Sequence, residues 1–124
     1  MGHIAGPIAD NRPLTRAETD LIRWMLEHGR SEALAFRKQL ESAAVVSRCP
    51  CGCASLDFSI AGQLAPSGPL EILGDYLFGG ANDLAGAFVF ARGGVLAGLE
   101  VYGLAGDHPR ELPAPESLRP FAQG

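Results

Sequence analysis

The residues of this chain that are best suited to chemistry are its three cysteines, which fall within five positions as Cys49-Pro50-Cys51-Gly52-Cys53. A thiolate is both a nucleophile and a soft metal ligand, so the cluster is compatible with a metal site or a redox site. The simplest interpretation is structural: the segment is a turn between two strands, and free cysteine packs as a small hydrophobic side chain. Reactive thiol chemistry would need a cation to lower the thiol pKa, and Arg48 is the nearest one in sequence.

Zinc is the cofactor that this cluster would suit best. Structural zinc sites use four ligands, usually in paired Cys-x₂₋₄-Cys groups, and the chain has no second cysteine pair. Cys49, Cys51 and Cys53 would therefore need a histidine, His28 or His108 or else His3, or a ligand from another subunit. The incomplete zinc pattern makes metal binding the alternative hypothesis to a structural turn.

Composition narrows the classes of function that fit this chain. Its 124 residues suffice for one domain with its own core, with 47% hydrophobic and 19% charged residues. A net charge of −4 argues against a nucleic-acid binder, which needs a basic face. We see no signal peptide and no apolar run of membrane-spanning length, so a cytoplasmic location is expected.

The N-terminal half predicts two helices. Residues 1–13 lack periodicity and are expected to be a flexible arm. Thr15 and Glu18 have the spacing of a capping box, which opens a helix that Gly29 should end in a left-handed conformation. A second helix is expected over residues 32–42, with Ser31 as its N-cap.

The C-terminal half predicts strands. They begin near Val45, continue over residues 56–60 and 70–78, and end in a hairpin that turns at Gly93-Gly94. Pairing Phe90 with Ala97 across this turn gives a core face, which we expect to carry Phe88, Phe90, Ala97, Leu99 and Val101. Residues 107–124 are rich in proline and should form an extended tail.

The second face of this hairpin is too apolar to be fully wetted. We expect it to form a contact surface that includes Val89, Leu96, Glu100 and Tyr102, covered by the proline-rich tail or by a second copy in a homodimer. Asp57 on a neighbouring strand could join Glu100 and Tyr102, although such groups are more often an ordinary polar patch.

Several segments resemble a family of small uncharacterised bacterial cytosolic proteins. They are Arg12-Pro13-Leu14-Thr15, Leu26-Glu27-His28-Gly29, residues 48–55 around the cysteines, and the hairpin that ends Leu99-Glu100-Val101-Tyr102. The resemblance implies a stand-alone α+β domain and brings no known activity, cofactor or catalytic residue. Family members often have a proline where this chain has Ala54, so the turn after the cysteines could differ here.

Together these observations predict a single α+β domain, with two N-terminal helices on one face of a four- to five-stranded, mainly antiparallel sheet. We interpret the protein as a non-enzymatic interaction module, of an immunity or regulatory type. Its acidic charge would suit a basic protein partner such as a toxin, rather than nucleic acid or a membrane. A zinc-binding or thiol-redox protein is the alternative.

Overall fold

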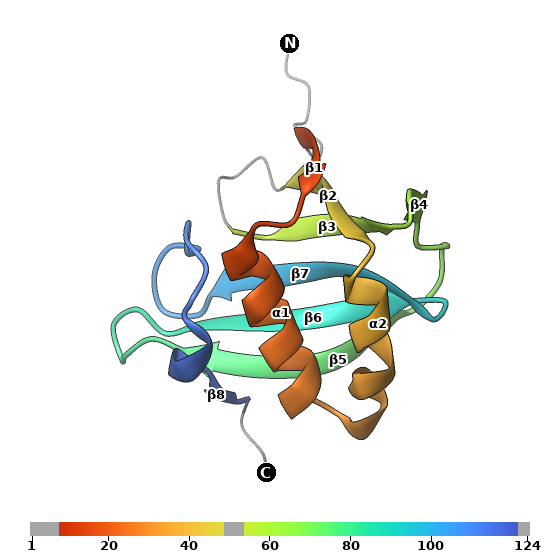
Figure 1. The fold of residues 1–124 in the computed structure, drawn as a ribbon. Coiled ribbons are helices and arrows are strands. Elements are labelled where there is room, and N and C mark those ends of the chain that lie inside the picture. The colour runs from red at the N-terminus through yellow and green to blue at the C-terminus, as the bar shows by residue number, and fades with distance from the viewer. Residues whose placement is uncertain (1–7, 49–53, 122–124) are drawn as a thin grey trace.

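The protein has an α+β fold with a single antiparallel sheet, as shown by a computed structural model that describes residues 8–48 and 54–121 (Figure 1). The helical segments are α1 (Arg16–His28), the 3₁₀ turn η1 (Ser31–Phe36), α2 (Arg37–Leu40) and the 3₁₀ turn η2 (Pro115–Ser117). The strands are β1 (Ile8–Pro13), β2 (Ala43–Arg48), β3 (Leu56–Ile60), β4 (Gln63–Leu64), β5 (Leu70–Phe78), β6 (Ala85–Arg92), β7 (Val95–Gly103) and β8 (Arg119–Pro120).

The sheet is larger than the sequence predicted. The described residues form eight strands in the order β1-β2-β3-β7-β6-β5-β8, with β4 paired to β3, so the expectation of four to five strands was wrong. The three unexpected strands among the described residues are β1, β4 and β8. Residues 8–13 of the expected flexible arm pair with β2, and the tail contributes the two-residue β8 beside β5. None of the helices in the described ranges is both long and apolar enough to cross a bilayer.

Helix α1 begins at the predicted capping box. The Thr15 hydroxyl accepts a hydrogen bond from the Glu18 amide, and the Glu18 carboxylate accepts one from the Thr15 amide. Arg12 adds two hydrogen bonds to the same carboxylate, at 2.9 and 2.8 Å. Burial disfavours the charge, but the hydrogen bonds from Arg12 and Thr15 and the charge of Arg12 together hold the pKa of Glu18 below its usual value. This cluster fixes the start of α1 beside the strand that contains Arg12.

The C-terminal end of α1 lies against β5. Gly29 ends the helix, but its backbone is extended, not left-handed as predicted (φ −88°, ψ −150°). Glycine is required here for close approach, because a Cβ atom at this position would collide with the Leu73 carbonyl oxygen. The Tyr76 hydroxyl donates a 2.7 Å hydrogen bond to the Met25 carbonyl, and burial together with the charge of Asp75 raises the pKa of Tyr76 to about 12.

The second helical segment covers the other half of the same sheet face. Instead of one helix over 32–42, the chain forms η1 and then a single α-helical turn, burying Ala33, Phe36 and Leu40. The side-chain amide of Gln39 donates to the Gly94 carbonyl at 2.9 Å and accepts from the Leu96 amide at 2.7 Å. Gln39 therefore ties α2 to the hairpin of β6 and β7.

That hairpin turns where the sequence predicted, but its register differs. Gly93 and Gly94 both have positive φ angles, and Arg92 pairs with Val95 as expected. An irregularity at Ala97 then inserts one extra residue into β7, so Phe90 pairs with Gly98 rather than with Ala97. Because of this bulge, the side chains of Leu99 and Val101 in β7 face the helices together with those of Ala87, Val89 and Ala91 in β6.

The outer edge of β5 is largely blocked. The Arg30 amide donates to the Leu73 carbonyl and the Arg30 guanidinium donates to the Ile72 carbonyl. The Phe121 amide donates to the Asp75 carbonyl, next to the two residues that pair with β8. These contacts occupy acceptors that another strand would otherwise use.

We expect Gly29→Ala to destabilise the protein by about 1–3 kcal/mol, because the added methyl group must push α1 away from the β5 backbone. Chemical denaturation would measure the change. Gly80→Ala is the matched control, since a Cβ at Gly80 meets its nearest atom, Asp83 Oδ1, at an ordinary 3.5 Å. Equal stability of the two variants would contradict a close contact at Gly29.

Candidate binding face

The candidate functional site is the face of the central strands that points away from the helices. Both helices lie in front of the sheet in Figure 1, and no described helix covers its far side. We call the far side of β5, β6 and β7 the open face. Strand pairing and exclusion from the core cluster assign its residues: Ile72, Asp75, Leu77, Gly86, Phe88, Phe90, Gly98, Glu100 and Tyr102.

The open face is not the contact surface that the sequence predicted. Val89 and Leu96 were expected on a contact surface covered by the tail or by a second copy, but both are fully buried beneath the helices. Phe88 and Phe90 were expected on the core face and instead lie on the opposite face, because the bulge at Ala97 shifts the register of the hairpin. Phe90 is nevertheless buried there. Glu100 and Tyr102 do share one face of β7, as predicted, and that face is the open one.

Two aromatic rings on the open face lie over glycines of the neighbouring strand. Phe90 and Gly98 are directly paired, and a Cβ at Gly98 would lie 2.8 Å from the Phe90 ring. Tyr102 and Gly86 are paired in the same way, and a Cβ at Gly86 would collide with the tyrosine ring. Aromatic side chains packed over strand glycines compensate for the missing side chain. The glycines therefore leave the space that both rings occupy.

Phe88 lies between these two rings. Its centroid is 5.7 Å from that of Phe90 and 6.1 Å from that of Tyr102, and both pairs are tilted by 56°. Tilted pairs at this distance are favourable aromatic contacts. Phe88 and Tyr102 are only half-buried, in contrast to Phe90. The result is a continuous aromatic surface with two rings accessible from solvent.

Carboxylates flank this surface on both sides of Phe88. Asp75 of β5 and Glu100 of β7 are its direct partners across the two strand pairs. Burial raises the pKa of Glu100, and the negative charge of Asp57 adds to the shift, while a hydrogen bond from Ser55 and the charge of His108 oppose it. Asp57 itself lies on the strand next to β7, where it pairs with Gly98. The open face thus combines aromatic rings with unneutralised acidic groups.

Asp75 is the least compensated of these acids. Its Oδ1 atom is buried and has no hydrogen-bond partner among the described residues. Burial raises its pKa, and a hydrogen bond from the Tyr76 amide opposes the shift only in part. The same charge contributes to the raised pKa of Tyr102, after burial, which shows that the two side chains are close. A desolvated carboxylate with one oxygen left without a donor is costly to the fold, and such groups are common at functional sites.

A recess of about 450 Å³ adjoins the open face where β3 and β4 meet the hairpin. Its walls include Asp57, the exposed Leu64, Phe90 and Arg92. Arg92 places its guanidinium carbon 5.7 Å from the centroid of the Phe90 ring and donates to the Gly68 carbonyl. The recess extends the accessible surface beyond Phe90.

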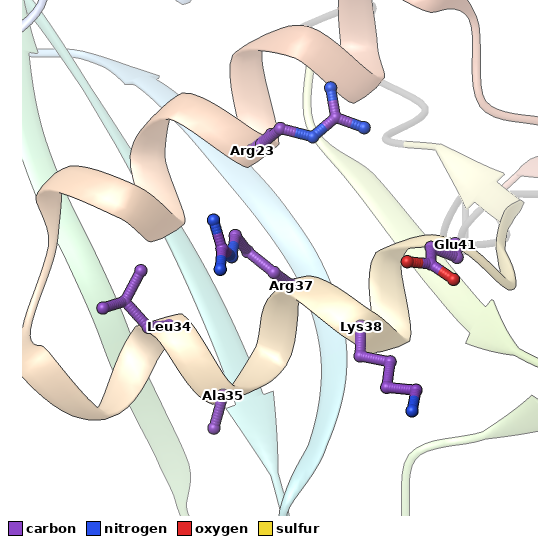
Figure 2. Close-up of a pocket in the computed structure, with 6 residues that line it drawn as sticks. All are labelled: Arg23, Leu34, Ala35, Arg37, Lys38 and Glu41. Atoms are coloured by element: carbon purple, nitrogen blue, oxygen red, sulfur yellow. The ribbon is translucent and has the colours of Figure 1, made fainter.

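A second recess lies on the helical side, between α1 and the η1–α2 segment (Figure 2). Three of its residues are cationic, namely Arg23, Arg37 and Lys38. Figure 2 shows that Arg37 reaches into the space between the helices, whereas Lys38 points away from α1. Arg37 is already paired with Glu27 at 3.2 Å and Arg23 with Asp20 at 3.4 Å. The side chains do not converge on a common point, so the open face is the better candidate.

The cysteine cluster lies outside the described residues, and the zinc and thiol hypotheses for Cys49, Cys51 and Cys53 stay predictions. Two of the three histidines considered as zinc ligands have other contacts, and the third, His3, lies outside the described residues. His28 stacks on Trp24 with ring centroids 4.0 Å apart, and its Nδ1 is 2.8 Å from the Trp24 carbonyl. His108 accepts a hydrogen bond from the Gly103 amide through Nδ1. Within the described residues, no three histidine, cysteine or acidic side chains group as metal ligands would.

Comparison with known proteins identified no related protein. No protein-family model matches the chain, and searches of curated proteins and of solved structures found no match. The resemblance to a bacterial family therefore stays a prediction, and function must be argued from the open face itself.

We expect Asp75→Asn to stabilise the protein at neutral pH, because it removes a desolvated charge. The raised pKa of Asp75 means that the folded state favours the protonated carboxyl, so ionisation begins to cost stability as the pH rises above the ordinary aspartate pKa, and the full cost is present above the raised pKa. The advantage of the variant should therefore shrink as the pH falls through the raised pKa of Asp75 and disappear below the ordinary aspartate value near ~4. Thermal unfolding from pH 3 to pH 8 (approximate limits) would measure this trend.

The exposed Asp107→Asn serves as the control for removing one negative charge. Lower stability of Asp75→Asn at neutral pH would show that the carboxylate has a favourable partner in the fold.

Proposed function

We propose that this protein is a non-enzymatic binding module that holds a protein partner on the open face of its sheet. The observation that carries the proposal is the half-buried pair Phe88 and Tyr102, which lie on a sheet face that no described helix covers. Accessible aromatic side chains of this kind are typical of interaction surfaces.

The rigidity of the rings supports binding. Gly86 leaves the space that Tyr102 fills, and Gly98 does the same for Phe90, so two of the three rings have little freedom to lose on association. Interfaces gain affinity when large side chains are already held in their bound orientation. The two rings are therefore already ordered in the free protein, which favours binding.

The composition of the face supports a partner rather than a catalytic reaction. It presents aromatic rings and carboxylates, groups that bury area and select for charge. The net charge of −4 favours a basic protein, which agrees with an immunity-type or regulatory role. The contact residues we assign are Phe88, Glu100 and Tyr102, with Asp75 beside them.

A photo-crosslinking amino acid in place of Tyr102 tests this proposal in cells that express the protein. We expect it to capture a defined partner, because Tyr102 is one of the two accessible rings and contacts the other, Phe88. The same amino acid at Leu34, an exposed apolar residue on the helical side, is the matched control. Phe88→Ser in the crosslinking protein should abolish capture while leaving the fold intact, since Phe88 lies outside the core cluster.

Capture of the same proteins from positions 102 and 34, or capture that persists in Phe88→Ser, would contradict a binding role for the open face.

A further inference from the structure

We propose that the open face binds a basic polypeptide segment by seating an arginine side chain on Phe88 and Tyr102, between the carboxylates of Asp75 and Glu100. This inference rests on the proposed binding function and names the chemistry of the partner. The arginine would stack on the accessible rings and donate hydrogen bonds to the carboxylate oxygens.

The strand register creates a site of the correct size. Asp75, Phe88 and Glu100 are directly paired across three adjacent strands, so their side chains form one row on the open face. Strands lie about 4.8 Å apart, which places the two acidic residues roughly 10 Å from each other with the ring between them. A planar guanidinium over the ring can reach oxygens on both sides, and its five donors exceed what one carboxylate accepts.

The negative charges in this row favour the binding of a cation. Asp75 Oδ1 is a buried acceptor with no donor among the described residues. The negative charge of Asp57 contributes to the raised pKa of Glu100. Burial raises the pKa of both Asp75 and Glu100, so a bound cation would relieve the cost of keeping them ionised. Tyr102 lies close to Asp75, which completes one side of the site with an aromatic face.

The protein already contains a contact of this type on the same face. Arg92 lies 5.7 Å from the centroid of Phe90, one aromatic position along β6 from Phe88. A cation within about 6 Å of a ring centroid is attracted by the ring, and arginine is used more often than lysine. The geometry needed at Phe88 is therefore one that this sheet accommodates.

A second copy of the chain fits this face poorly. A symmetric dimer through the open face would bring together Asp75 and Glu100 from both copies, while the two arginines beside the face, Arg92 and Arg119, already donate to the carbonyls of Gly68 and Gly79. Like charges removed from water without counter-charges are strongly unfavourable. The charge pattern thus favours a basic partner over the homodimer.

The test is a titration of the ¹⁵N-labelled full chain with the peptide acetyl-Ala-Arg-Ala-Arg-Ala-amide, followed by amide chemical shifts. The control peptide replaces each arginine with citrulline, which keeps the shape and removes the charge. We expect saturable shifts in β5, β6 and β7 around Phe88 with the arginine peptide, at least about tenfold weaker binding of the citrulline peptide, and weaker binding at high salt.

Matched variants test the role of the carboxylates. Asp75→Asn with Glu100→Gln should weaken binding of the arginine peptide by about tenfold or more. The control, Asp107→Asn with Glu41→Gln, removes the same charge from exposed positions outside the face and should change the affinity less than about twofold. Single variants of Asp75 and Glu100 provide the measurement if the double variant loses its dispersed spectrum.

Each other outcome overturns the inference in a recognisable way. Equal binding of both peptides on the open face would remove the need for a cation while leaving a binding face intact. No shift with either peptide, combined with successful crosslinking at position 102, would mean a partner of other chemistry; failure of both experiments would also reject the proposed function. A doubled mass in solution that returns to the monomer value in Phe88→Ser would identify a second copy as the occupant.

Discussion

The close approach of α1 to β5 is the constraint on which the rest of this structure depends. At the end of the helix the backbone of Gly29 nearly touches that of Leu73, and Tyr76 bonds to the last turn through Met25. A helix this close to a sheet leaves room only for small side chains between them, and β6 supplies Ala87, Val89 and Ala91. The larger residues of the same strand must then lie on the other side, which is why the aromatic rings form an accessible surface.

Much of the fold could be predicted because its signals are local. The capping box of Thr15 and Glu18, the turn at Gly93-Gly94 and the bounds of β5 follow from residue types within a few positions of each other. The strands that escaped prediction, β1, β4 and β8, are short or rich in polar residues. They exist because a neighbouring strand offers free backbone groups, and a single sequence does not show which strands will be neighbours.

The sequence predicted one part of the candidate site and missed another. Alternation placed Glu100 and Tyr102 on one face of a strand, and the structure confirms that they share it. Alternation failed for β6, because both of its faces are apolar and the bulge at Ala97 decides which of them turns inward. Val89 and Leu96 are therefore core residues, whereas Phe88 belongs to the surface. The pairing of Gly86 and Gly98 with aromatic residues was a usable signal, but it becomes evident only once the register is known.

The hydrogen bonds that Arg30 and Phe121 make to the outer edge of β5 bear on aggregation. They cap carbonyl groups of a nine-residue strand that would otherwise template the addition of a foreign strand and start fibril-like growth. Loss of Arg119–Phe121 by proteolysis would expose the part of this edge formed by Asp75, Tyr76 and Leu77. Residues that take no part in the core therefore protect this edge from strand addition.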